Sequence, residues 1–471
     1  MRRLFRYLKG YEKETVIAPL FKMLEACFEL LVPLVVARIV DEGIQNADLP
    51  FIWRQCGLLV LLAVVGMASS LTAQYFAAKS ALGFGTALRR DLFAHINTLS
   101  HTELDRMGTP TLVTRMTSDV NQVQNGLNMT LRLLLRSPFI VIGAILMALT
   151  ISPVLTLWFL GITAVISLVI WAIMRATVPI YHDAQTTLDR VTQLTRENYV
   201  GARVVRAFSR QKDEMAGFAA ANDRLRDVQL AAGRISALMN PITYLIVNLG
   251  AIAILWHGGR QVDAGALTQG EVMALLNYLS QILLNLLRIA DLVIIMTRAV
   301  ASAVRVSEVL ATPTTMPDPA APELAPAAGA PAIAFEDVSF TYRGAGAPSL
   351  QGIGFSAAPG ETVGVIGGTG SGKTTLIDLI ARFYDAGAGC VKLFGHDVKE
   401  YSFAQLRRLV GIVPQRAMLF TGTIRDNMRW ACSDATDEQI WAALEIAQAA
   451  DFVRGKPGGL DEPVETAGRN F

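Results

Sequence analysis

The chain has 471 residues, of which 52% are hydrophobic and 17% are charged. The charged share lies below the roughly 25% of soluble domains, so the composition indicates a membrane protein. The length allows two or three domains. A formal net charge of +2 gives no electrostatic case for a nucleic-acid partner. The four cysteines are scattered without a CxxC pair, which implies neither a zinc site nor a disulfide framework.

The N-terminal part of the chain carries the membrane signal. Met1–Tyr11 is basic and amphipathic and no small-residue cleavage site follows it, so we expect an interfacial elbow helix rather than a removable signal peptide. The apolar stretches that follow approach or exceed the roughly 20 residues that cross a bilayer. They predict six spans, at Val16–Ala37, Leu58–Ala77, Leu133–Thr150, Val154–Met174, Leu238–Trp256 and Val272–Ile295.

The distribution of Lys and Arg predicts the orientation of these spans. Basic residues concentrate before the first span and in the two long connections, between spans 2 and 3 and between spans 4 and 5. The positive-inside rule therefore places both chain ends and the long connections in the cytosol. Both connections are compatible with helical arms of about 35–40 Å that break near Gly108 and Gly201. We favour a contact role for their tips over two inert solvated hairpins, since long insertions are usually functional.

Polar residues inside the predicted spans leave two interpretations open. Glu25 and Glu29 lie on one face of the first span, and they predict either a substrate pathway or structural pairing with a neighbouring helix. Lys22 is nearer the cytosolic end, where its side chain could extend to the interface. A polar stripe in the sixth span is expected to line a wet cavity. Its members are Asn277, Gln281, Asn285 and Arg288.

A different pattern begins after the spans. Ala311–Pro331 is rich in Pro and Ala and lacks periodicity, which predicts an inter-domain linker. Alternating residues predict a strand at Ala332–Tyr342, and a short apolar run predicts another at Thr362–Ile366. A helix is expected over Lys373–Phe383. The order of strand, Gly-rich loop and helix is the context of a phosphate-binding loop.

The loop between this second strand and the helix fits the G-x-x-x-x-G-K-[ST] pattern. Its glycines allow a tight turn that aims several backbone N–H groups at a phosphate chain. Lys373 would add a positive charge for the outer phosphates, and the Thr374 hydroxyl could hold Mg²⁺. The predicted nucleotide-binding residues are Gly367, Gly368, Thr369, Gly370, Ser371, Gly372, Lys373, Thr374 and Thr375.

With these features the chain resembles the ATP-binding cassette exporters of the fused half-transporter type, over essentially its whole length. Phe335–Tyr342 is similar to the family's opening strand, which implies that Tyr342 stacks on adenine; a packed core tyrosine is the alternative. Gly411–Gln415 is similar to the family's Q-loop. The resemblance implies that Gln415 reaches Mg²⁺, takes part in catalysis and moves with the membrane domain. Phe420–Asn427 also matches the family.

The membrane half carries the same resemblance. Thr114–Val120 and Asn198–Phe208 are similar to the two cytoplasmic loops of these exporters. This implies coupling helices near Thr109 and Arg203 that dock on nucleotide domains. Leu34–Gly43 is similar to one half of bacterial heterodimeric multidrug exporters.

The expected fold is therefore multi-domain. A six-helix α-helical transmembrane exporter domain is expected at 1–308, a linker at 309–331, and an incomplete α/β P-loop nucleotide-binding domain at 332–471. In the family, the signature motif and the Walker B strand follow the position of Phe471. We therefore expect a truncated record, whose chain alone hydrolyses no ATP.

The resemblance implies a function and its partners. It is ATP-driven export of amphipathic small molecules, of the multidrug type, across the bacterial inner membrane, with ATP and Mg as cofactors and the nucleotide domain in the cytosol. The implied partners are a second half-transporter, the lipid bilayer and a hydrophobic or amphipathic substrate, and no nucleic acid. A heterodimer is favoured and a homodimer remains possible. The alternatives are lipid or peptide export on the same scaffold, and a non-hydrolysing ATP-binding membrane regulator or inactive fragment.

Overall fold

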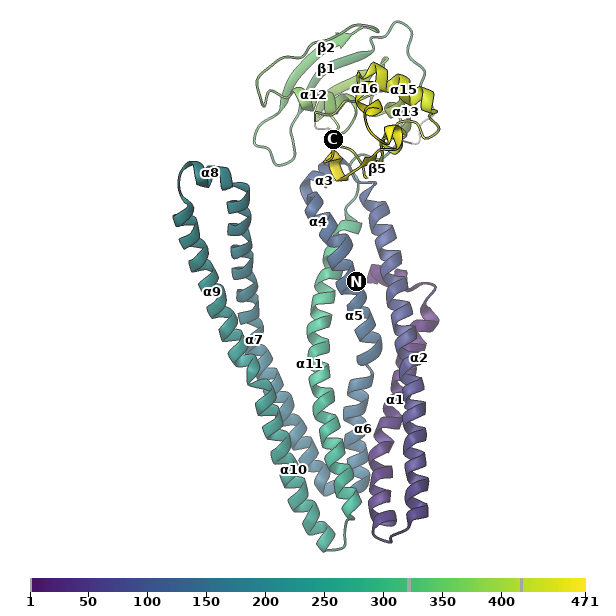
Figure 1. The fold of residues 1–471 in the computed structure, drawn as a ribbon, viewed down its shortest axis with the longest axis vertical. Helices are drawn as coiled ribbons and strands as arrows, with labels where there is room; N and C mark the ends of the chain where they lie inside the picture. The colour runs from purple at the N-terminus through teal and green to yellow at the C-terminus, as the bar shows by residue number, and fades with distance from the viewer. Residues whose placement is uncertain (1, 320–322, 416–417) are drawn as a thin grey trace. The chain divides into compact units, whose positions relative to one another are not determined.

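The computed structural model describes residues 2–319, 323–415 and 418–471. The chain forms two compact units, which are Met1–Leu99 with Glu103–Thr314, and Ser100–Thr102 with Thr315–Phe471. The first unit is built of long helices, whereas the second combines a β-sheet with short helices (Figure 1). This division confirms the predicted class, a helical membrane-type region followed by a smaller α/β domain.

The first unit begins with the short 3-10 helix η1 (Arg2–Leu8), which buries Leu4 and Tyr7 and exposes Phe5. Its long helices are α1 (Glu12–Arg38), α2 (Leu49–Ile96), α5 (Val120–Leu133), α6 (Arg136–Ile151), α7 (Pro153–Val200), α9 (Gln211–Ala237), α10 (Met239–Asp263) and α11 (Gln269–Ala311). Shorter helical segments join them, namely η2 (Ile39–Ile44), α3 (His101–Met107), α4 (Thr109–Thr114), η3 (Arg115–Asp119) and α8 (Ala202–Ala207).

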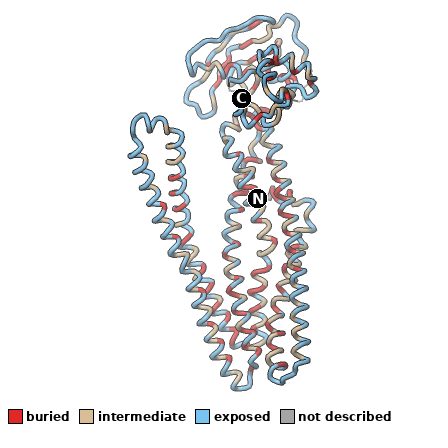
Figure 2. Tube along the Cα trace, in the orientation of Figure 1, coloured by how far each residue is buried: buried red, intermediate tan, exposed pale blue. Residues whose placement is uncertain are grey.

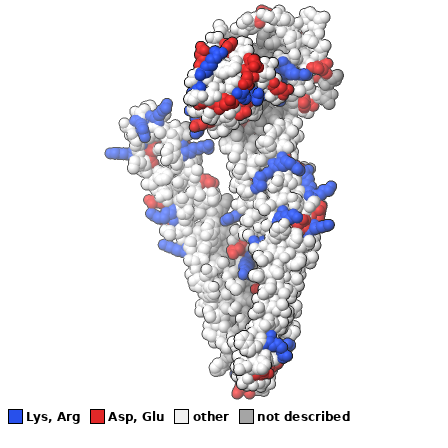
Figure 3. All heavy atoms as spheres, turned by 45° about the vertical axis from the view of Figure 1, so that its right-hand side comes forward, with Lys and Arg blue, Asp and Glu red and all other residues white. Residues whose placement is uncertain are grey.

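Within the described residues, five helical stretches are long and apolar enough to cross a membrane, and each contains one predicted span. They are Leu49–Ile96, Thr109–Ile151, Pro153–Val200, Gln211–Asp263 and Gln269–Ala311. The remaining predicted span lies in α1, a helix of 27 residues that carries Lys22, Glu25 and Glu29 in its middle. With these charges in its middle, α1 is not among the five stretches. The face in Figure 3 shows long uncharged stretches over this unit, as a lipid-facing surface requires.

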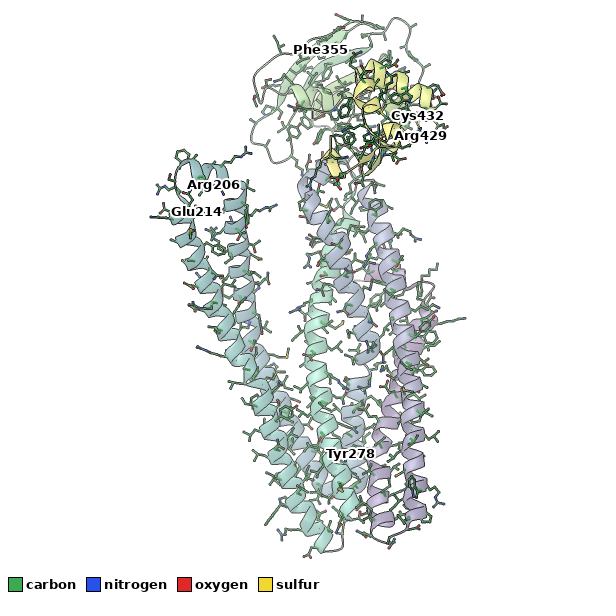
Figure 4. All side chains as sticks on the ribbon, in the orientation of Figure 1. Arg206, Glu214, Tyr278, Phe355, Arg429 and Cys432 are labelled. Atoms are coloured by element: carbon green, nitrogen blue, oxygen red, sulfur yellow. The ribbon has the colours of Figure 1, made fainter. Side chains whose placement is uncertain are left out.

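The core of this helical unit lies where α1, α6, α7, α10 and α11 pack together. Figure 2 shows buried positions recurring along the helices of this core, with exposed positions between them. Tyr278 on α11 is fully buried, and its hydroxyl donates a 2.7 Å hydrogen bond to the carbonyl oxygen of Leu30 (Figure 4). The bond satisfies a polar atom that would otherwise be costly to bury. Close helix contact also requires small residues, since a Cβ on Gly143 would lie 2.4 Å from the Leu30 side chain.

The predicted breaks in the two long connections are confirmed. Gly108 separates α3 from α4 with a φ of 75°, a left-handed conformation that glycine adopts without steric cost. Gly201 separates α7 from α8. Beyond this break, α9 returns along α7, so that α8 lies at the tip of a long hairpin (Figure 1). In the first connection, the short helix α3 precedes Gly108.

The Thr114–Val120 segment is held by one buried carboxylate. Asp119 is 3% exposed and accepts hydrogen bonds from Arg115 Nη1 at 2.7 Å and from Arg305 Nε at 3.0 Å. The Arg305 guanidinium also donates to the second carboxylate oxygen. This two-bond pairing, which is among the stronger kinds of ion pair, fixes η3 to α11.

The second unit contains a four-stranded antiparallel sheet in the order β2-β1-β3-β4 and a small β5–β6 pair. Its strands are β1 (Ile333–Phe340), β2 (Leu350–Ala357), β3 (Ala388–Leu393), β4 (His396–Asp397), β5 (Gly422–Thr423) and β6 (Pro463–Val464). Its helical segments are α12 (Lys373–Ile380), α13 (Phe403–Leu409), α14 (Ile424–Met428), α15 (Asp437–Ile446), α16 (Ala450–Arg454), η4 (Gly459–Asp461) and η5 (Thr466–Gly468). Across β1 and β2, the rings of Phe335 and Phe355 stack at 4.8 Å (Figure 4).

Part of the predicted linker packs on this second unit. Leu324 forms two backbone hydrogen bonds with the side chain of Gln405, at 3.1 and 2.6 Å. Arg408 donates to Glu323 at 2.6 Å, and the backbone N–H of Ala327 donates to the Phe394 carbonyl. The segment after residue 322 is therefore part of the packed unit although its sequence lacks periodicity.

The predicted strand at Thr362–Ile366 is wrong for this structure. Residues 361–368 form neither strand nor helix, and the side chain of Ile366 is 96% exposed. A strand exists through hydrogen bonds to a neighbouring strand, and no described strand pairs with this segment. Val413, in the Gly411–Gln415 segment that is similar to a Q-loop, is also exposed. Both segments thus present apolar side chains that have no partner within the described residues.

Candidate nucleotide-binding site

The phosphate-type loop turns sharply into α12. Gly370 and Gly372 have φ values of 84° and 86°, which belong to the left-handed region that favours glycine. Gly372 is also confined by space, because a Cβ there would lie 2.7 Å from the carbonyl oxygen of Ser349. These two glycines therefore allow the sharp turn of the loop, since other residues would be strained at these φ values and a side chain would not fit at Gly372.

Lys373 is the first residue of α12, and its side chain folds back over the loop. Its ammonium group donates hydrogen bonds to the carbonyl oxygens of Gly367 at 2.8 Å and Gly368 at 2.7 Å, and lies 3.3 Å from Ser371 Oγ. The positive charge is thus held inside the curve of the loop, beside the N-terminus of a helix. Backbone N–H groups and the helix dipole at such a position both favour an anion.

The two threonines after Lys373 have different surroundings. Thr375 is buried, and its hydroxyl lies 3.0 Å from the hydroxyl of Tyr342. Thr374 is exposed, and its hydroxyl forms no hydrogen bond with any residue that the structure describes. Of the two, Thr374 is therefore available for a metal ion, and Thr375 makes a packing contact.

Tyr342 lies beside the loop but is half-buried. Its ring meets Phe340 edge-on at 4.8 Å and Tyr384 edge-on at 5.3 Å, while its hydroxyl reaches α12 through Thr375. Both interpretations from the sequence, a base-stacking residue and a packed tyrosine, are compatible with this placement. Tyr384 supports the ring, and no pattern in the sequence indicates its role.

Two substitutions at Tyr342 separate these interpretations. If the ring stacks on the base, Tyr342→Phe should keep ATP affinity and Tyr342→Ala should weaken it by about 1–3 kcal/mol. If the ring is only packed, Tyr342→Ala should lower thermal stability without a matching loss of affinity in the fraction that stays folded. Titration of each variant with a fluorescent ATP analogue, together with its melting temperature, gives both quantities.

Gln415 is not brought to the loop by any described contact. Its side chain is exposed, and no hydrogen bond between it and the phosphate loop is present within the described residues. Arg416 and Ala417, which follow it, lie outside the residues that the structure describes. The structure therefore joins Tyr342 to the loop and leaves the role of Gln415 a prediction.

The Phe420–Asn427 segment is held by its own side chains, which the sequence did not predict. Asn427 hydrogen-bonds both backbone groups of the segment's first residue, each at 2.8 Å. Arg425 donates to Asp461 at 2.9 Å and to Asp437. These hydrogen bonds raise the pKa of Arg425, and the bond from Arg425 lowers the pKa of Asp461. They connect α14 to α15 and η4 across the surface of the second unit.

A second constellation lies in the helical unit, where charged residues of α1 meet α6. Arg136 is 8% exposed and donates to Glu29 at 2.5 Å, with Glu25 at 3.7 Å. Lys22 donates to Glu25 at 2.5 Å and to Ser70 at 2.9 Å. Each carboxylate thus has a cation beside it, which favours structural pairing over a free substrate contact.

This ionic cluster corrects two expectations. Lys22 is 6% exposed, so its side chain is packed between helices and does not extend to the interface. Asn285 is 1% exposed with its oxygen 3.5 Å from Arg136, so it belongs to the cluster and not to a wet cavity lining. Gln281 donates to the carbonyl oxygen of Glu29 at 3.4 Å. Arg136 itself was missed, because it stands within the first turn of the predicted span Leu133–Thr150, where an arginine is usually interfacial.

Comparisons with known proteins agree with this arrangement. Residues 15–287 match the family described as ABC transporter transmembrane region, and residues 350–461 match the family described as ABC transporter. An uncharacterized ABC transporter ATP-binding protein of Mycobacterium tuberculosis is 35% identical over 469 residues, which is 99% of this chain and 80% of that protein.

Two further relatives have names that describe a cargo. A multidrug efflux ATP-binding/permease protein of Mycobacterium tuberculosis is 30% identical over 475 residues, covering 100% of this chain and 39% of that protein. A fatty acid ABC transporter ATP-binding/permease protein of Mycobacterium bovis is 33% identical over 381 residues, covering 81% of this chain and 60% of that protein. With both family matches along one chain, the protein is a multi-pass membrane protein that belongs to the ABC transporters, in the half-transporter form that joins one transmembrane region to one ATP-binding domain.

Proposed function

We propose that this protein is one half of an ATP-driven exporter that moves hydrophobic or amphipathic small molecules across the bacterial inner membrane. The observation that carries the proposal is the phosphate loop, where Lys373 is held inside the curve at the start of α12. The described part of the same chain holds five helical stretches long and apolar enough to span a bilayer. A nucleotide site and a membrane region in one chain fit energy-coupled transport.

ATP would bind with its phosphates in the loop, its base against Tyr342, and Mg²⁺ at Thr374. Within the described residues no group of three or more His, Cys, Asp or Glu side chains could hold a metal ion by itself. Mg²⁺ commonly takes substrate phosphates and a few protein ligands, so this donor set fits it. The chain's own residues would bind and orient the nucleotide, with Gln415 as a further ligand and catalytic residue. Catalysis of phosphoryl transfer is mainly positioning and charge stabilisation.

The loop tips would transmit nucleotide-driven motion. No residue of α8 is buried, and the side chains of Val204 and Phe208 are exposed beside Arg203 and Arg206. Figure 3 shows Lys and Arg gathered at the tip of this hairpin, where Figure 4 places Arg206 and Glu214. An exposed surface that is both apolar and basic fits a docking role against a nucleotide domain. A second half-transporter would supply that domain, in a heterodimer or, alternatively, a homodimer.

Lipids are the main alternative to drug-like amphiphiles as the cargo of this exporter. The names of two relatives, multidrug efflux and fatty acid transport, favour either drug-like amphiphiles or lipids as cargo. Peptide export on the same scaffold is a more distant alternative. A membrane regulator that binds ATP without hydrolysis is the alternative from another functional class.

Transport in inverted membrane vesicles tests the proposal. Vesicles from cells that express the protein with a partner half should accumulate a fluorescent amphiphile when ATP is added. Accumulation should be lost without ATP, with a non-hydrolysable analogue, and in the Lys373→Ala variant. ATP binding without any accumulation, across drug-like and lipid probes, would favour the regulator and contradict export.

A further inference from the structure

A groove lined by side chains of α7 and α11 lies within the helical unit. Its volume is about 800 Å³, and it is open to one side. On α7 the groove extends from Ser167 to Pro179, which corresponds to about 18 Å of helix at 1.5 Å per residue. Its dimensions therefore suit an elongated ligand rather than a compact one.

The walls of the groove are two apolar rows. Ile170, Met174 and Val178 recur every fourth residue along α7 and so share one face. On α11 the opposite row is formed by Leu286, Ile289 and Val293. Since the two rows face each other across a single trough, the groove has room for one hydrocarbon chain along its length.

One charge interrupts this apolar lining. Arg175 is the single charged side chain among the described residues that line the groove. It forms no hydrogen bond or ion pair with any described residue, and its only ring contact places the guanidinium 6.0 Å from the centre of the Trp171 ring. The cations of the nearby ionic cluster differ in this respect, because Lys22 and Arg136 are both paired with carboxylates. The Arg175 side chain is exposed, so its guanidinium is free to pair with an anionic group of a ligand in the groove.

The position of Arg175 also gives the groove a direction. Arg175 follows the predicted span Val154–Met174, on the side of α7 that continues into the long cytosolic hairpin. The groove continues from Arg175 back to Ser167, into the span. A ligand would therefore have its charged group near the cytosolic surface and its chain towards the membrane interior, which is how an amphiphile lies in the cytosolic leaflet.

We infer that this groove binds a single-chain amphiphile with an anionic headgroup, its chain along the two apolar rows and its carboxylate on Arg175. The inference rests on the proposed export function and names the cargo class. The planar guanidinium fork matches a carboxylate with two parallel hydrogen bonds. The groove thus offers one cation, Arg175, for one negative charge, and one apolar trough for one hydrocarbon chain.

A series of ligands with the same chain tests the headgroup. Oleate, oleyl alcohol and oleylamine share an 18-carbon chain and differ in charge, so each can compete with a fluorescent fatty acid for the purified protein in phosphatidylcholine nanodiscs. We expect oleate to bind about tenfold or more tightly than oleyl alcohol, and oleylamine to bind worst. Arg175→Gln should reduce oleate affinity to that of the alcohol, and Arg175→Lys should retain part of it. Arg298→Gln, which removes an exposed arginine of α11 outside the groove lining, should change nothing.

Several outcomes would overturn the inference. Equal affinities for oleate and oleyl alcohol would remove the role of charge, as would unchanged oleate binding in Arg175→Gln. Displacement of oleate by phosphatidylglycerol in the nanodisc at equal mole fraction would assign the groove to a two-chain bilayer lipid. ATP-driven accumulation of neutral amphiphiles without oleate binding would contradict this inference and leave export standing. Oleate binding without any ATP-driven movement would keep the groove assignment and contradict export.

Discussion

Lys373→Ala is expected to remove most of the affinity for ATP. The Lys373 ammonium is the cation that the loop holds inside its curve, bonded to the carbonyl oxygens of Gly367 and Gly368. A hydrogen bond to a charged group contributes about 1.5–3 kcal/mol, so the loss predicts an affinity that is about 10- to 100-fold weaker. Titration with a fluorescent ATP analogue measures this directly.

A matched lysine controls for the general effect of charge. Lys392 lies on β3 of the same unit, where it pairs with Glu336 at 2.7 Å and takes no part in the loop. Lys392→Ala should leave ATP affinity unchanged. If Lys373→Ala binds ATP as the wild type does, the assignment of the phosphate loop must be abandoned.

Arg136→Met is expected to destabilise the helical unit more than any surface substitution. It would leave Glu29 without its 2.5 Å partner and would remove the positive charge 3.7 Å from Glu25. Breaking a buried ion pair from one side typically costs about 3–5 kcal/mol. Because the Glu29 side chain is still 35% exposed, we expect the lower end of that range, about 3 kcal/mol. Thermal unfolding of the purified protein in detergent would show this as a lower midpoint.

The double substitution Arg136→Met with Glu29→Gln distinguishes charge from packing. Removing both partners leaves no unpaired charge between them, so part of the stability should return, since replacing a buried pair is often neutral. Arg90→Ala, at an exposed arginine of α2, should lie within about 0.5 kcal/mol of the wild type. A double variant as unstable as Arg136→Met would show that the arginine acts through packing, and a stable single variant would remove the cluster's structural role.

Features that depend on neighbours in the sequence were predictable. Hydropathy along the chain locates the helices, because a span needs only about 20 consecutive apolar residues. Gly108 and Gly201 mark the helix breaks within one turn of their positions. The phosphate loop follows from a contiguous pattern, and the left-handed conformations of Gly370 and Gly372 show why glycine is required there.

Features that depend on distant residues were decided by the tertiary structure. Arg136 and Glu29 are separated by 107 residues, and Arg305 and Asp119 by 186 residues. No periodic pattern in the local sequence predicts such pairs, since each pair forms only when two helices pack at a given rotation. The trough between α7 and α11, with Arg175 beside it, likewise exists only after the two helices have come together.

The segment Thr362–Ile366 shows the same limit of prediction from sequence, here for an element that was expected and did not form. Its short apolar run predicts a strand, yet the structure leaves it without a strand partner and exposes Ile366. Apolar residues give a segment a tendency to be buried, but a strand is completed only by the backbone of a neighbour. The sequence by itself thus determined the membrane helices and the curvature of the nucleotide loop, which depend on residues close along the chain. Only the tertiary structure decided the ion pairs, the groove and the sheet, because each needs two segments to meet in space.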